Sequence, residues 1–225
     1  MKAKKENKSQ KRLFFPGSML ILTFIIWTIL IQTVDVQPVG PNETYVGFAT
    51  LNSWFHKLTG VHMTVYTVTD WLGLVPVFIC MMFGGMGFRQ LVKRRSMLKV
   101  DYDIIYLGVY YVMVIVCYLI FEMIPINYRP ILIEGRMEAS YPSSTTLLVL
   151  CVMPTFIFQM NQRLENITAK QIMRVLTIVF SMFMLVGRLI AGVHWFTDIV
   201  GAVFLSAGLF YFYKAVVMWS SQKEN

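Results

Sequence analysis

Six long apolar segments determine what this chain can fold into. They cover approximately residues 13–34, 69–88, 102–124, 143–160, 174–192 and 198–219. A helix needs about 20 apolar residues to cross a bilayer, whereas a spanning strand would alternate polar and apolar residues. The chain is 56% hydrophobic and only 14% charged, well below the roughly one quarter that is charged in soluble domains. We therefore expect an all-α fold, an integral membrane bundle of six transmembrane helices.

The positions of lysine and arginine predict the orientation of this bundle. Of the 20 cationic residues, 16 precede the first span, lie in or directly beside the second or fourth loop, or lie near or after the end of the last span. The other loops hold only Lys57, Arg129, Arg136 and Arg188. Because lysine and arginine are enriched in cytoplasmic loops, we expect both termini in the cytoplasm. The basic segments are short and flank apolar spans, so they indicate no nucleic-acid partner.

The chain is expected to form one membrane domain with short ends. We assign residues 1–12 to a basic cytoplasmic segment, 13–219 to the six-helix domain and 220–225 to a cytoplasmic tail. The first outer loop, about residues 35–68, is long and rich in aromatic and polar residues. Such a segment is suited to lie at the level of the lipid headgroups, where we expect it to form a lid or a lipid gate.

Three loops that should face the outside carry polar residues suited to phosphate chemistry. They are Tyr128-Arg129-Pro130, the segment from Tyr141 to Thr146, and the segment from Gly187 to Asp198. Polar and ionisable residues in or beside a membrane are functional candidates by default. Because all three segments lie at one side of the predicted bundle, we expect them to converge.

The last of these segments contains a candidate nucleophile. Asp198 follows His194 by four residues and is spaced to orient the imidazole through one ring nitrogen, which leaves the other free to attack an electrophile. Arg188 and Arg129 are planar cations that match phosphate oxygens. Ser143 and Ser144 open the fourth span, where backbone N–H groups favour an anion. We assign no metal and no cofactor, since the histidines and acids are not at metal-ligand spacing.

These motifs resemble the type 2 phosphatidic acid phosphatase superfamily. Arg188-x5-His194-x3-Asp198 is similar to its third signature, with Gly187 in place of serine; Pro142-Ser143-Ser144-Thr145 resembles the second, Pro-Ser-Gly-His, and Arg129-Pro130 the end of the first. The resemblance covers roughly residues 65–215. It implies that His194 forms a phosphohistidine, that Asp198 supports it and that Arg188 and Arg129 bind the phosphate. It also implies a bacterial plasma-membrane enzyme whose site faces the extracytoplasmic side.

Two positions depart from the pattern. Thr145 stands where the family has the histidine that protonates the leaving group, and Glu122 stands where the first signature has lysine. Arg136 is a candidate to supply the missing cation, and His62 is a candidate replacement acid; Asp70, Glu134 and Glu138 lie on the same side.

The missing acid bears on the choice of substrate. A lipid alkoxide, whose conjugate acid should resemble water with a pKa of about 15.7, needs a proton on leaving, whereas a lipid monophosphate has a relevant pKa of about 6. We therefore expect a preference for phosphoanhydride substrates.

Three functions fit this sequence. The first is a membrane lipid phosphatase or pyrophosphatase that acts through a phosphohistidine on a lipid phosphate or a polyprenyl pyrophosphate. The second is a lipid phosphotransferase, as in sphingomyelin synthases, which have a related histidine and aspartate arrangement. The third is a degenerate member that binds or moves phosphorylated lipids without hydrolysis, which the residues Thr145 and Glu122 favour. The sequence indicates no oligomeric state.

Overall fold

The computed structural model describes residues 2–221, with side chains from residue 13 onward. Lys223 and most of the predicted tail lie outside the described residues, as do the side chains of the basic segment 1–12. The helices are α1 (Lys2–Thr33), α2 (Ala49–Thr59), α3 (Met63–Leu72), α4 (Leu74–Arg94), α5 (Tyr102–Met123), α6 (Ser144–Arg163), α7 (Ile167–Ile190) and α8 (Phe196–Ser221), with two short 3-10 turns, Pro41–Glu43 and Met97–Lys99. The described residues form no β-strand beyond isolated bridges. The predicted all-α fold with six helical spans is confirmed.

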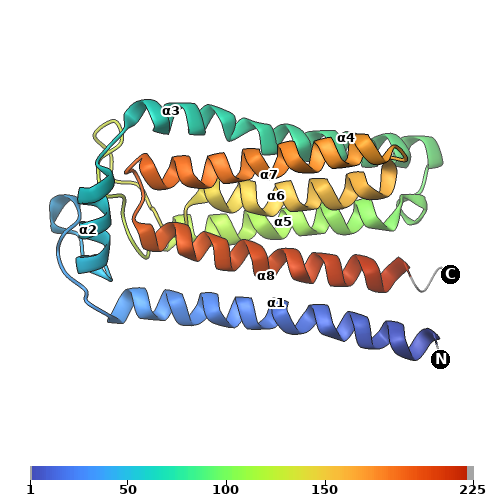
Figure 1. The fold of residues 1–225 in the computed structure, drawn as a ribbon, viewed down its shortest axis with the longest axis horizontal. Coiled ribbons are helices and arrows are strands. Elements are labelled where there is room, and N and C mark those ends of the chain that lie inside the picture. The colour runs from blue at the N-terminus through green and yellow to red at the C-terminus, as the bar shows by residue number, and fades with distance from the viewer. Residues whose placement is uncertain (1, 222–225) are drawn as a thin grey trace.

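The six spans run side by side, and α1 begins at the same end of the bundle at which α8 ends (Figure 1). We call this end the termini end and the opposite end, where α2 lies, the site end. Helix α1 packs along α8 at two glycines. A Cβ atom at Gly208 would lie 2.7 Å from Cδ1 of Ile21, and one at Gly17 would lie 3.3 Å from Cβ of Tyr211. Small residues of this kind let membrane helices approach closely.

The second span is longer than predicted. It was expected over residues 69–88, but α3 and α4 together form one apolar span from Met63 to Arg94, with a break at Gly73. The prediction was wrong because threonines dilute the apolar pattern of α3. Their hydroxyls bond to carbonyls of the same helix, Thr67 to Met63 at 3.0 Å and Thr69 to Val65 at 2.8 Å. The polar groups are thus satisfied inside the helix, as a bilayer requires.

Other predicted boundaries also differ from the ends of the helices. Helix α7 begins at Ile167, seven residues before the expected start at 174, because the side chain of Asn166 caps it by accepting a hydrogen bond from the Ala169 N–H at 3.0 Å. Lys170 and Arg174 therefore lie inside the helix and not in a loop. Residues 63–68, assigned to the first outer loop, lie in α3.

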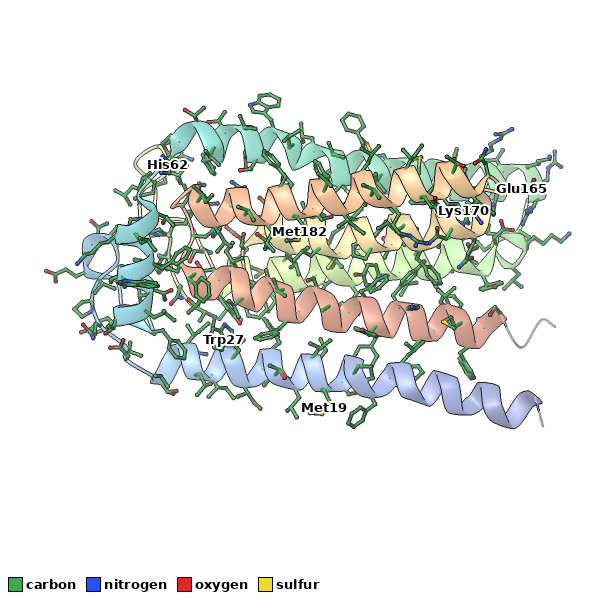
Figure 2. All side chains as sticks on the ribbon, viewed as in Figure 1. Met19, Trp27, His62, Glu165, Lys170 and Met182 are labelled. Carbon is green, nitrogen blue, oxygen red and sulfur yellow. The ribbon has the colours of Figure 1, made fainter. Side chains whose placement is uncertain are left out.

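Helix α2 lies across the site end, at a steep angle to the spans (Figure 1). Asn52, which is fully buried, ties it to the start of α8: its Nδ2 donates to Oγ1 of Thr197 at 3.0 Å, and its Oδ1 accepts from the Thr197 N–H at 3.2 Å. Trp54 and Leu58 on the other side of the helix are exposed. Figure 2 shows His62 at this end and Glu165 and Lys170 at the opposite end. The first loop therefore covers the end of the bundle that carries the candidate site.

Candidate active site

Three segments that are distant in sequence meet beneath α2. The Ser143 N–H donates to the carbonyl of Asp198 at 3.2 Å, which joins the start of α6 to the first turn of α8. Nδ2 of Asn127 donates to Oδ1 of Asp198 at 3.3 Å, which brings in the loop after α5. Nη2 of Arg188, near the end of α7, donates to Oγ1 of Thr145. The segments that the sequence expects to converge therefore form one buried cluster.

His194 lies in the turn between α7 and α8 and is only 4% exposed. Its Nδ1 is 3.1 Å from the carbonyl oxygen of Ser140, whereas Nε2 has no hydrogen-bond partner in the described part of the chain. A carbonyl oxygen can only accept a hydrogen bond, so Nδ1 carries the proton in the neutral ring. The lone pair is then on Nε2, the nitrogen that is free to act as a nucleophile.

Burial lowers the pKa of His194 to about 4. The positive charges of Arg129 and Arg188 lower this pKa further, and the Asp198 carboxylate opposes the shift. Burial dominates because the imidazolium form loses its solvation in the site. The ring is therefore neutral, and its Nε2 unprotonated, at any pH well above 4.

Asp198 supports His194 less directly than the sequence suggests. Its Oδ2 lies 3.8 Å from Nδ1, which is an ion-pair distance and too long for a hydrogen bond. Oδ2 instead accepts from the backbone N–H of Trp195 at 2.8 Å, and Oδ1 accepts from Asn127. The carboxylate thus fixes the turn that carries His194, while the Ser140 carbonyl accepts the hydrogen bond from Nδ1 of the ring.

Two arginines lie close to this histidine. Arg188 is 1% exposed, and its Nη2 contacts Oδ1 of Asp70 at 2.9 Å in addition to Thr145. Arg129 is 9% exposed, and its Nε lies 3.1 Å from Oε2 of Glu138 but is not aligned for a hydrogen bond. The ring of Tyr66 lies under both guanidinium groups, 5.0 Å from Cζ of Arg188 and 5.8 Å from Cζ of Arg129. One aromatic ring therefore lies within cation–π distance of both guanidinium groups.

The polar atoms of this cluster are left largely without partners. Among the described residues, eight buried side-chain nitrogen and oxygen atoms have no hydrogen-bond partner, and six of them belong here. They are Nε and Nη1 of Arg129, Oγ of Ser140, Nε and Nη1 of Arg188, and Nε2 of His194. Leaving a buried donor unpaired typically costs about 1–3 kcal/mol, and more for a charged group. Such a concentration of unpaired cationic donors is suited to bind an anion.

The residues that open α6 have different surroundings. Ser143 is fully buried and donates its hydroxyl to Oγ1 of Thr146 at 3.0 Å, so this hydroxyl proton is already used. Ser144 borders two cavities, and Thr145 borders one of them and accepts from Arg188. Of the serines predicted to bind phosphate, the structure therefore leaves the hydroxyl of Ser144 the more accessible.

Two cavities adjoin the cluster. The smaller, about 210 Å³, is polar and is lined by Glu122, Arg129, Glu138 and Ser144 together with neighbouring residues. The larger, about 500 Å³, begins at Asp70, Ser144 and Thr145 and continues between α4, α5 and α6. Its walls there are apolar and include Val77, Val114, Ile115, Leu148 and Val152. We call this larger cavity the apolar groove; it runs from the polar cluster along apolar side chains of α4, α5 and α6.

Two candidates from the sequence lie apart from the cluster. Arg136 is exposed in the turn that pairs it with Ile133 through backbone hydrogen bonds. His62 is exposed, and its Nε2 lies 2.8 Å from the carbonyl of Thr59, although its backbone N–H bonds to Ala191, three residues before His194. No group of three or more histidine, cysteine or acidic side chains in the described residues is placed to hold a metal.

Several contacting residues were not assigned to the site from the sequence. The Ser140 carbonyl and Asn127 could not be identified, because a backbone acceptor and a single amide carry no spacing signal. Asp70 carries a signal that was available, since a carboxylate within an apolar span is a functional candidate. Tyr66 is found only from the structure, which places its ring under both guanidinium groups.

Comparisons with known proteins identify the family and support the fold. A family model described as the PAP2 superfamily matches residues 77–222. No curated protein sequence matches the chain. Among solved structures, the chain is similar to a transmembrane PAP2-type phosphatidylglycerolphosphate phosphatase from Bacillus subtilis, with a TM-score of 0.61 and 18% sequence identity, covering 90% of this chain and 96% of the other. At this identity the match supports the fold.

Proposed function

The chain belongs to the PAP2 superfamily, and we propose that it is a membrane lipid phosphatase or pyrophosphatase that works through a phosphohistidine at His194. The observation that carries this proposal is the set of unpaired buried donors on Arg129 and Arg188 around an unprotonated Nε2. An anion receptor alone would need the cations but not a neutral nucleophile among them. The combination favours phosphoryl transfer over simple binding.

The proposed reaction has two steps. Nε2 of His194 attacks phosphorus, the bond from phosphorus to the leaving oxygen breaks, and the arginines bind the oxygens of the transferred phosphoryl group. The ring becomes positive as the N–P bond forms, and the Asp198 carboxylate at 3.8 Å stabilises that charge. Water then attacks phosphorus, the N–P bond breaks, and inorganic phosphate leaves. Water, and not a second lipid, is the acceptor in this proposal.

The apolar groove is suited to hold the lipid tail. It begins at Asp70 and Thr145, the two side chains that share Nη2 of Arg188, and continues along apolar walls. Thr145 cannot protonate a leaving alkoxide near neutral pH, and no histidine takes its place there. We therefore propose that the enzyme prefers a polyprenyl pyrophosphate, whose leaving phosphate has a pKa of about 6, over phosphate monoesters.

We further propose that the site end faces the outside of the cell. The ends of α4 and α6 and the start of α7 carry Arg89, Lys93, Arg94, Arg163 and Lys170 at the termini end. By the positive-inside tendency, this end is cytoplasmic and the site is extracytoplasmic. Cysteine introduced at Trp54 of a cysteine-free variant should then react with a membrane-impermeant maleimide added to intact cells.

Trapping the intermediate tests the main proposal. The purified protein is incubated with farnesyl pyrophosphate that carries a radiolabelled terminal phosphate, and the reaction is then quenched. We expect an acid-labile, base-stable phosphoprotein that is absent from His194→Asn, together with free phosphate. Label transferred to a second lipid without free phosphate would indicate a transferase. Binding without either product would indicate a degenerate binder, and turnover of phosphatidic acid as fast as the pyrophosphate would contradict the substrate preference.

A further inference from the structure

We propose that Asp70 is the general base that activates the water for the second step, the hydrolysis of phosphorylated His194. This inference rests on the proposed function, because it assigns a residue to the breakdown of that intermediate. Asp70 lies near the end of α3, on an element outside the three segments that resemble the family signatures.

The second step needs a proton acceptor that the first step leaves free. Once Nε2 of His194 is bonded to phosphorus, Nδ1 still donates to the Ser140 carbonyl, so the ring cannot take a proton from water. Asp198 is fully buried, and its two oxygens already accept from Trp195 and Asn127. Neither member of the histidine and aspartate pair can therefore act as this base.

Asp70 is placed beside the phosphate site and at the opening of the apolar groove. Its Oδ1 lies 2.9 Å from Nη2 of Arg188, and this Nη2 also bonds to Thr145. The side chain of Asp70 is 57% exposed, whereas that of Arg188 is 1% exposed. The carboxylate is therefore not enclosed by protein, and a water that enters the groove can reach it.

The direction of attack distinguishes Asp70 from Glu138, the other acid that pairs with an arginine of the site. In phosphoryl transfer the attacking and leaving groups lie roughly in line through phosphorus. The water therefore enters from the side that the lipid leaving group has vacated. Asp70 borders the apolar groove in which we place the lipid tail, whereas Glu138 borders the smaller cavity. Asp70 is thus on the side from which the water attacks.

The carboxylate of Asp70 takes one proton from water as the water oxygen forms a bond to phosphorus. The bond from phosphorus to Nε2 breaks, and its electron pair returns to the ring, which regains the neutral form with the proton on Nδ1. Inorganic phosphate leaves, and Asp70 releases its proton to solvent.

The variant Asp70→Asn separates this role from a structural one. Its amide oxygen can still accept from Arg188, but the side chain no longer takes a proton from water. With radiolabelled farnesyl pyrophosphate we expect phosphorylation of His194 to stay within a few-fold of wild type. Phosphate release should fall by about 10²–10⁴-fold, the usual contribution of a general base, so the phosphoprotein should accumulate at steady state.

The matched control is Glu138→Gln, which removes the acid that pairs with the other arginine. We expect it to lower phosphorylation and release together, without accumulation of the phosphoprotein. A second measurement uses Asp70→Ala, in which added formate should restore phosphate release without changing the rate of phosphorylation.

Two results would count against the proposals in different ways. If Asp70→Asn slows phosphorylation and release in parallel, and formate does not restore release by Asp70→Ala, then Asp70 only positions Arg188 and the inference fails. If wild type forms no phosphoprotein and releases no phosphate, the proposed function itself fails.

Discussion

The two ends of the bundle each contain an arginine paired with an aspartate, and the two pairs differ in how fully their hydrogen-bonding groups are satisfied. At the site end, Arg188 contacts Asp70 and Thr145 but leaves Nε and Nη1 without partners. At the termini end, Nη2 of Arg163 lies 2.7 Å from Oδ2 of Asp103. No buried side-chain nitrogen or oxygen of Arg163 or Asp103 lacks a partner.

The pair at the termini end belongs to a network that joins three helices. Arg163 also donates to the carbonyl and side-chain oxygens of Gln159, and Nε2 of Gln159 donates to the hydroxyl of Tyr213 at 2.6 Å. The network connects α5, α6 and α8. At the termini end, where the buried groups of the pair have partners, the arginine and aspartate stabilise helix packing. At the site end, where donors remain unpaired, the same residue types indicate a binding site.

The largest expected effect comes from removing the cation at the site end. Arg188→Met should lower kcat/KM by about 10³-fold or more, because a single lost donor to a developing negative charge already costs about 10²–10³. The free energy of unfolding should stay within about 1 kcal/mol or rise, because the change removes two buried donors that have no partner. Asp70, which is left behind, is 57% exposed and is therefore not a buried charge without a partner.

Thermal unfolding in detergent and steady-state kinetics on the same preparation check this prediction. Arg136→Met serves as the control, since Arg136 is exposed and lies apart from the cluster. A large loss of stability in Arg188→Met would show that the unpaired cation is structural after all, and would remove the distinction between the two ends.

The converse change, Arg163→Met, should affect stability and leave chemistry unchanged. It leaves Asp103 buried without its partner, which we expect to lower the free energy of unfolding by about 3 kcal/mol, the lower end of the range for breaking a buried pair. The lower end applies because the Arg163 side chain is 23% exposed. Activity per folded molecule should match wild type, and Asp103→Asn combined with Arg163→Met should recover part of the loss. Lower activity per folded molecule would mean that the ends are coupled.

The fold could be predicted because the bilayer imposes a simple requirement. Six apolar segments of sufficient length predict six helices, and the structure contains them. The error at α3 had a physical origin. Threonines such as Thr67 and Thr69 lower the hydropathy of this segment, but their hydroxyls bond to carbonyls of the same helix, so the helix remains compatible with a membrane. Helix α2 could be expected only as a lid-like loop, because its orientation depends on the contact of Asn52 with Thr197.

The site could be predicted only in part. Spacing identifies residues that act together within one short segment, but it does not identify contacting residues that are distant in the sequence. His194, Asp198 and Arg188 lie within a single segment, and their spacing indicated a shared role. The Ser140 carbonyl, which accepts a hydrogen bond from Nδ1 of His194, lies 54 residues from His194 in the sequence. Asp70 lies 118 residues from Arg188. Contacts at such separations follow from how the helices pack, which no local pattern encodes.

A third change tests whether the absence of a general acid is what limits the hydrolysis of phosphate monoesters. Thr145→His places an imidazole at the mouth of the apolar groove. We expect hydrolysis of phosphatidic acid to rise by about 10²-fold, the low end of the contribution of a general acid, while turnover of farnesyl pyrophosphate changes little. Thr145→Val is the matched control and should show no gain with either substrate. An equal gain with both substrates would show that protonation of the leaving group is not what distinguishes them.

The smallest expected effect concerns the protonation of His194. It tests whether water is excluded from the cluster, as the burial of its residues indicates. Because burial lowers the pKa of His194 to about 4, the ring should stay neutral and reactive down to about pH 5. A histidine with the ordinary pKa of about 6.5 would retain only about one thirtieth of its neutral form at that pH. The profile of kcat/KM, which reports the free enzyme, should therefore lose activity only as the pH falls through about 4, once ionisation of the substrate has been titrated separately by phosphorus NMR. Arg129→Gln removes a positive charge that lowers this pKa, so its acidic limb should move upward by a small amount. A midpoint of the acidic limb near pH 6.5 in wild type would mean that water solvates the ring. The unpaired donors of the arginines would then bond to water and would not indicate a phosphate site.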